Sequence, residues 1–182
     1  MKIQGHAAGG WLATRLFLKH LSPADRSESN NLLTLGLIGG VLPDLDYLIY
    51  VFKKGRIAYE GDFRHHTWVT HTIPFYSIAA LLLYMLGAVN KNLHLKKAAK
   101  VLSISTTAHL LQDTLGSGDG IMLFYPATKK MFGIGLSGLH GEEWNQHYTK
   151  TSFYALEKFI VITAIVTFFY DIYHNRKHRS KP

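Results

Sequence analysis

The 182-residue sequence contains no cysteine, few acidic residues and no sustained alternation of polar and apolar side chains. Without cysteine there are no disulfides and no thiolate ligands, so a transition-metal site has to be built from histidine and carboxylates. Without period-2 alternation there is no signal for half-buried strands, so we predict an all-α fold. The length is typical of one compact domain, and we expect residues 1–182 to form a single helical domain.

Helices are predicted wherever apolar runs are bounded by proline, glycine or charged residues. Five segments meet this description: residues 6–21, 32–42, 73–89, 98–114 and 153–173. The second segment carries Gly36, Gly39 and Gly40, small residues that allow neighbouring helices to approach closely, and Pro43 interrupts it. We therefore expect a bundle of about five main helices.

Charge-free runs long enough to cross a bilayer are scarce, since a span needs about 20 apolar residues and only residues 73–89 come near. The mean hydropathy of +0.03 leaves a soluble domain with buried helices as an alternative.

The positions of the basic residues favour a membrane protein. They gather at residues 91–100 and in a tail at 174–182, beside apolar runs. With both stretches cytoplasmic, the apolar segments alternate across the bilayer, so we predict a multi-pass membrane protein with a cytoplasmic C-terminus.

Histidine is abundant, and most of the 11 histidines lie with carboxylates in four short stretches at the ends of apolar segments. His109 and Asp113 are four residues apart, which puts them on one helix face with Cβ atoms about 5–6 Å apart. Asp44 and Asp46 would diverge on a helix but could face one point in a turn. Each pair alone also fits an ion pair, a helix cap or a solvated loop.

The densest stretch holds His65, His66 and His71 just before the third helix. His66 and His71 are five residues apart, which is off one helix face, so we expect a loop there, with His65 as a bystander. On the membrane threading above, one outer end of the bundle collects His6, Asp44, Asp46, His66, His71, His109 and Asp113. This set predicts a divalent-metal site, for which histidine and carboxylate ligands suit zinc or manganese.

The order and spacing of these motifs over roughly residues 1–126 resemble the LexA-binding, inner-membrane-associated hydrolase family of bacteria. The motifs are Gly5-His6, Pro-Asp-Leu-Asp at 43–46, His66 with Thr70-His71-Thr72, His109 through Asp113, and Gly120 to Pro126. The resemblance implies an inner-membrane, metal-dependent hydrolase similar in fold to zinc-dependent phospholipase C and P1 nuclease. It implies as metal ligands His6, Asp44, His71, His109 and Asp113, joined by Asp46 and His66.

Two departures from the family pattern bear on the substrate. This chain has His66-Thr67 where the family tends to have His-Arg, and Thr70-His71-Thr72 where it tends to have Thr-His-Ser. If the family arginine contacts a phosphate, Arg64 would have to take that part from another position. In the later segment from His140 to His147, His140 and Glu143 are spaced by three and could add ligands, whereas a solvated interfacial helix is the alternative.

The function that the metal-ligand set and the resemblance together imply is hydrolysis of phosphoester bonds in membrane lipids, with small-molecule phosphoesters also in range. Asp46 or Glu143 could serve as general base. The alternative is a non-enzymatic membrane protein, a regulatory or partner-binding module in which the metal only holds helices together. A nuclease would draw on the net charge of +8, but the basic stretches lie away from the site, so no nucleic-acid partner is expected.

Overall fold

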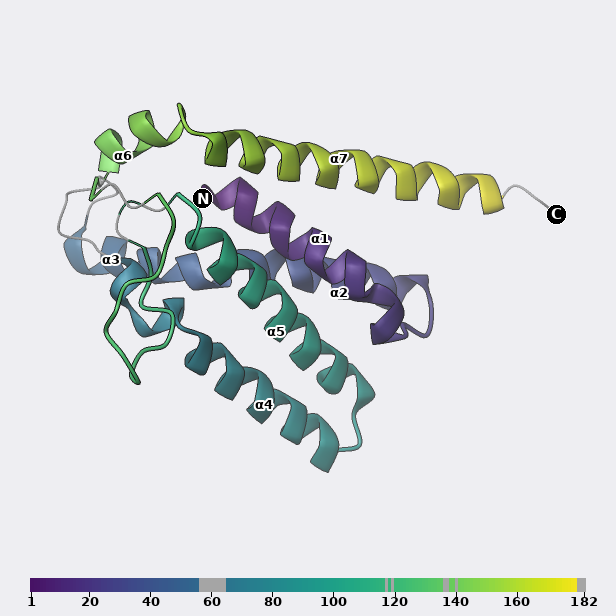
Figure 1. The fold of residues 1–182 in the computed structure, drawn as a ribbon. Helices are drawn as coiled ribbons and strands as arrows, with labels where there is room; N and C mark the ends of the chain where they lie inside the picture. The colour runs from purple at the N-terminus through teal and green to yellow at the C-terminus, as the bar shows by residue number, and fades with distance from the viewer. Residues whose placement is uncertain (56–64, 117, 119, 136–137, 140, 180–182) are drawn as a thin grey trace.

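A computed structural model describes residues 1–55, 65–116, 118, 120–135, 138–139 and 141–179. The described part of the chain is helical, with two isolated β-bridges and no strand, which confirms the all-α prediction (Figure 1). Its α-helices are α1 (Ile3–Leu21), α2 (Arg26–Val41), α3 (Asp46–Lys54), α4 (Ile73–Val89), α5 (Leu93–Asp113), α6 (Gly141–Tyr148) and α7 (Ser152–Arg179). Three short 3₁₀ turns are η1 (Leu42–Leu45), η2 (His65–Thr67) and η3 (Val69–His71).

The five predicted segments correspond to α1, α2, α4, α5 and α7, and α4 has the predicted bounds. The helix α2 begins six residues earlier than predicted because the side chain of Asp25 accepts a hydrogen bond from the backbone of Glu28 at 2.8 Å. In the same way Asn92 caps α5 through the backbone N–H of Leu95 at 3.2 Å. The basic tail is mostly a continuation of α7, which runs to Arg179.

Glycines set the distance between α1 and α2. A Cβ atom on Gly10 would lie 2.6 Å from the Cα atom of Gly40, closer than real side chains come. The predicted role of the small residues in the second segment is therefore seen where α1 crosses α2. The close approach also fixes the backbone of Gly40, whose carbonyl faces α5.

Substituting Gly40→Ala should destabilise the protein by about 1–3 kcal/mol, because the added methyl group meets the backbone of α1. Alanine is the better helix former, so a purely local effect would have the opposite sign. Thermal unfolding followed by tryptophan fluorescence in detergent measures the difference. Thr34→Ala, at an exposed site on α2, is the matched control. A Gly40→Ala protein that unfolds at the control's temperature would contradict the packing.

Large apolar side chains stay exposed along α4 and α7. Segments Arg26–Phe52 and Ser152–His174 are long and apolar enough to cross a membrane, and only 6% of the second is buried. Extended exposed apolar surface is rare on soluble monomers, so it favours the membrane alternative. The helix α7 lies along α1, where Arg15 donates two hydrogen bonds of 2.8 Å to Asp171.

The two ends of the bundle differ in character (Figure 1). At one end the start of α1, the end of α5, the start of α4 and the turns η1 and η3 come together. At the other end lie the α4–α5 turn with Lys91 and the C-terminal end of α7. The candidate metal ligands and the predicted cytoplasmic basic stretches are thus at opposite ends. Which end faces the cytoplasm stays a prediction.

Candidate metal centre

Four side chains from three elements meet at one point at the end of the bundle: Asp44 of η1, His71 of η3, and His109 and Asp113 of α5. One ligand atom from each lies within 4.8 Å of all the others. The Oδ2 atom of Asp113 is 2.9 Å from Nε2 of His109 and 3.7 Å from Nε2 of His71. Oδ1 of Asp44 is 3.7 and 3.5 Å from the same two nitrogens. Two imidazoles and two carboxylates therefore surround one buried point.

His109 is held from behind by the backbone of α2. Its Nδ1 lies 2.7 Å from the carbonyl oxygen of Gly40, which can only accept, so Nδ1 carries the proton and donates it. The lone pair of Nε2 then points at the carboxylates. Among the described residues, the buried atoms Nε2 of His109 and Oδ2 of Asp113 have no hydrogen-bond partner. Buried polar atoms without partners are costly, and a bound cation would satisfy both, so these residues fit a divalent metal.

His71 is oriented by a second carboxylate. Its Nδ1 lies 3.2 Å from Oδ2 of Asp46, and the hydroxyl of Thr70 donates to the same oxygen at 2.7 Å. Asp44 is on the Nε2 side of the ring, so the two aspartates face opposite edges of one imidazole. As predicted, Asp44 and Asp46 both face one point, the ring of His71. They contact opposite edges of that ring because Asp44 lies in η1, whereas Asp46 belongs to the first turn of α3.

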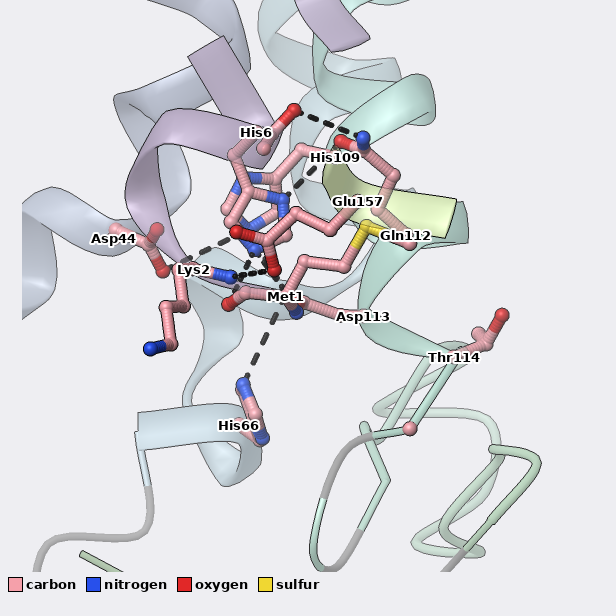
Figure 2. Close-up of polar contacts among 12 residues, drawn as sticks. Met1, Lys2, His6, Asp44, His66, His109, Gln112, Asp113, Thr114 and Glu157 are labelled. Carbon is pink, nitrogen blue, oxygen red and sulfur yellow. Dashed lines mark hydrogen bonds and ion pairs between the residues drawn. The ribbon is translucent and has the colours of Figure 1, made fainter. Parts of the chain in front are cut away.

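His6 stacks on His109 with ring centroids 3.9 Å apart, which places the predicted ligand of α1 beside the group (Figure 2). Its Nε2 lies 3.0 Å from Oδ1 of Asp113, the oxygen that faces away from His71 and His109. The amino group of Met1 lies 3.2 Å from the same oxygen. Gln112 completes this side, with Oε1 3.3 Å from Nδ1 of His6 and Nε2 donating to the carbonyl of Gly5.

His66 lies on the opposite, more open side of Asp113 (Figure 2). Its Nε2 is 3.9 Å from Oδ2 of Asp113, and its ring centroid is 5.2 Å from that of His71. The side chains of His66 and Asp44 are 17% and 19% exposed, whereas those of His6, His71, His109 and Asp113 are at most 1% exposed. Among the described residues of the centre, those of η1 and η2 are therefore the least buried.

Other predicted residues lie elsewhere. Glu143 and His147 are exposed on α6, and Glu143 is outside the group of four found among the described residues. His140 and Arg64 lie outside the described residues, as does the side chain of His65. The catalytic role expected for Glu143 stays a prediction.

Sequence reasoning overlooked a buried carboxylate on α7. Glu157 is 1% exposed and accepts hydrogen bonds from the hydroxyl of Tyr148 at 2.7 Å and from the backbone N–H of Lys2 at 3.0 Å. It ties α7 to the start of α1 beside the centre (Figure 2). The signal was present, because an acidic residue inside an apolar helix is unfavourable unless it has partners.

The carboxylates of the centre favour positive charge on His71, either a proton or a metal ion. Burial by itself lowers the pKa of His71, but hydrogen bonds to Asp44 and Asp46 and the charge of Asp113 outweigh burial and raise the pKa to about 9. The proton on His71 therefore stabilises the metal-free fold fully below pH 6.5, and that contribution is lost as the pH rises through about 9. A cation that binds Nε2 of His71 has to displace this proton.

Zinc affinity should therefore rise about tenfold per pH unit between pH 7 and 9 and level off above. Competition with a chelating dye at a series of pH values measures this slope. His20→Ala, on an exposed histidine at the far end of α1, should leave the slope unchanged. A pH-independent affinity across this range would show that His71 is not protonated in the metal-free protein.

Together these features define a class: a helical protein with two helices long and apolar enough to cross a membrane, and with a buried histidine–aspartate cluster at one end of its bundle. The model of the YdjM inner membrane protein family matches residues 1–176, and the chain belongs to that family. This confirms the assignment made from the motifs and extends it beyond residue 126 through most of α7. The family name indicates the inner membrane. No curated protein and no solved structure matches the chain, so the likeness to phospholipase C and P1 nuclease stays a prediction.

Proposed function

We propose that this protein is an inner-membrane hydrolase that uses a divalent cation, zinc or manganese, to cleave phosphoester bonds in lipids. Asp44, His71, His109 and Asp113 would hold the cation. The observation that carries the proposal is that two buried acceptor atoms, Nε2 of His109 and Oδ2 of Asp113, lie 2.9 Å apart and neither has a hydrogen-bond partner in the part of the chain that the structure describes. Two acceptors that face each other so closely are costly unless a cation or a proton lies between them.

An open side favours catalysis over a purely structural site. Structural zinc sites are closed by four protein ligands, whereas catalytic sites leave a position for water or substrate. Here Asp44 and His66 are both partly exposed on the same side of the buried group. A substrate could approach between η1 and η2 without unfolding the bundle.

A bound divalent cation supplies an acidified water and polarises a phosphoryl oxygen. The chain's own residues orient the histidine ligands and position the substrate. Gly40 fixes the tautomer of His109, and Asp46 holds the ring of His71 with its Nε2 toward the centre. His66, at the open edge, is placed to hold a proton or contact an anionic oxygen. Asp46 and Glu143 remain the predicted general bases.

Lipid phosphoesters suit the surroundings of the centre. The site is at the end of the bundle where α4 begins, and α4 exposes apolar side chains from Phe75 onward. The phosphoester groups of lipids lie just outside the hydrocarbon layer, at the level where such an apolar surface begins. A soluble phosphoester, which has no acyl chains, would not contact this apolar surface.

The test is turnover of lipid phosphoesters by the full chain in nanodiscs, followed by release of diacylglycerol or phosphate. We expect turnover with zinc or manganese, loss with a chelator, and at least a 100-fold loss for His109→Ala. Full metal occupancy without turnover of any lipid or nucleotide ester, together with a lower Tm after chelation, would contradict the proposal. That outcome would support the alternative, a regulatory membrane protein with a structural metal.

A further inference from the structure

A short excursion of the chain between α5 and α6 carries the inference. Ile121 and Phe132 form an antiparallel bridge with two backbone hydrogen bonds of 3.0 and 2.8 Å. Ile121 and Leu123 are buried against Tyr76 and Leu110, and Phe132 packs on the same cluster. The bridge and the cluster fix the base of the excursion. Its outer part, residues 124–130, is called the tip below.

The residues just before the tip are hydrogen-bonded to His66, beside the metal centre, and to the start of α4. The backbone N–H of Met122 donates to the carbonyl of His66 at 3.2 Å, and the N–H of Ile73 donates to the carbonyl of Leu123 at 2.9 Å. The first hydrogen bond joins the excursion to His66, the partly exposed histidine of the centre, and the second joins it to Ile73, the first residue of α4. In Figure 1 the green chain of this region accordingly lies beside the start of α4.

The tip has the residue types that bind a lipid surface. Phe124 is 42% exposed, and Lys129 and Lys130 are exposed as well. No acidic residue occurs between positions 121 and 134, so the local charge is positive. Lys130 lies over the ring of Phe132 at 5.6 Å, and that ring meets Phe124 edge-on at 5.1 Å. Lysine combines an apolar stem with a charged end, as residues at membrane interfaces do, and the wholly apolar ring of Phe124 suits the hydrocarbon side of that interface.

The height of the tip relative to the bilayer follows from α4. This helix exposes Phe75, Ile78, Leu81, Leu82, Met85, Leu86 and Val89, a surface that begins within its first turn. The hydrogen bond from Ile73 to Leu123, the residue just before the tip, joins the excursion to the beginning of that surface. The tip is therefore at the border between hydrocarbon and headgroups, where anionic lipids attract lysine.

We propose that residues 124–130 dock an anionic lipid, with Phe124 inserted among the acyl chains and Lys129 and Lys130 on the lipid phosphate. The excursion that carries the tip is hydrogen-bonded through Met122 to the backbone of His66, one of the partly exposed residues of the metal centre. That the docked lipid is a substrate rests on the proposed function; the docking itself does not.

The absence of cysteine gives a clean test, because one engineered cysteine is the sole labelling site. Ala127→Cys, at an exposed position in the tip, carries a spin label in the full chain. Nanodiscs of phosphatidylcholine are compared with nanodiscs containing phosphatidylglycerol, and accessibility to oxygen and to a water-soluble nickel complex gives the depth. Leu82→Cys on α4 and His147→Cys on α6 supply the lipid and water references.

We expect the label at 127 to lie between the two references and to move several-fold toward oxygen accessibility with phosphatidylglycerol. The shift should disappear with Lys129→Gln and Lys130→Gln together, and with Phe124→Ala. Lys91→Gln with Lys96→Gln, at the opposite end of the bundle, should leave it intact. A label as accessible to nickel as the one at 147 in both lipids would overturn the docking proposal.

Metal content separates this proposal from the proposed function. The lysine double variant should keep the full metal content of the unsubstituted protein. A chain that inserts its tip but binds no metal would overturn the hydrolase and leave the docking intact. A metal-loaded chain whose tip stays in water would overturn the docking alone.

Discussion

Asp113→Asn is expected to lower the affinity for zinc or manganese by two to four orders of magnitude. Oδ2 of Asp113 faces Nε2 of His71 and Nε2 of His109, and its Oδ1 faces His6. Asparagine keeps the shape but removes the charge from a carboxylate that is 1% exposed. Removing one member of a buried charged cluster costs about 3–5 kcal/mol, which corresponds to this range of affinity. Chelator competition on the detergent-purified chain measures the change.

The matched control for this substitution is Glu143→Gln, another carboxylate-to-amide change, at an exposed position outside the group of four. It should leave metal affinity within a factor of about two. Thermal unfolding of the metal-free proteins separates loss of affinity from loss of fold. If folded Asp113→Asn protein binds metal within fivefold of the original chain, the centre is not where the geometry puts it.

Asp46→Ala is expected to weaken metal binding about 10- to 100-fold, the usual effect of removing a carboxylate that orients a histidine ligand. Its Oδ2 receives both the Nδ1–H of His71 and the hydroxyl of Thr70. Without it, the imidazole can rotate and Nε2 leaves its position toward Asp44. Affinity measured by the same competition method should fall without a comparable fall in the Tm of the metal-free chain.

Asp46→Asn distinguishes the roles that the sequence left open for this residue. The amide oxygen still accepts from Nδ1 of His71, so an orienting role predicts near-normal affinity and turnover for asparagine and a loss only for alanine. A general base predicts normal affinity and lost turnover with asparagine. A direct ligand predicts that both variants lose the metal, which would contradict the position of Asp46 behind His71.

Apolar periodicity and breaker residues were sufficient to predict the main helices. The uncharged run at 73–89 predicted both ends of α4 correctly, and the glycines of the second segment predicted close helix packing, which the structure shows between α1 and α2. The short helix α3 was missed for a local reason. Pro43 indicates the end of a helix, yet it lies in the 3₁₀ turn η1 (Leu42–Leu45), which continues into α3.

The site was predictable as a set of residue types and not as a set of contacts. Helical spacing placed His109 beside Asp113, and the structure brings both together with Asp44 and His71. Which oxygen of Asp113 faces which imidazole, and which side of His71 Asp46 occupies, depend on packing between distant elements. The acceptor for His109 is a backbone carbonyl of α2, to which no side-chain pattern points.

The most direct test of the central claim is elemental analysis of the full chain after purification from membranes without added metal. The account predicts at least one equivalent of zinc or manganese in the unsubstituted protein and in His20→Ala, and close to none in the double variant His109→Ala with Asp113→Ala. Equal zinc and manganese contents in the double variant and the unsubstituted protein would contradict the metal centre described above.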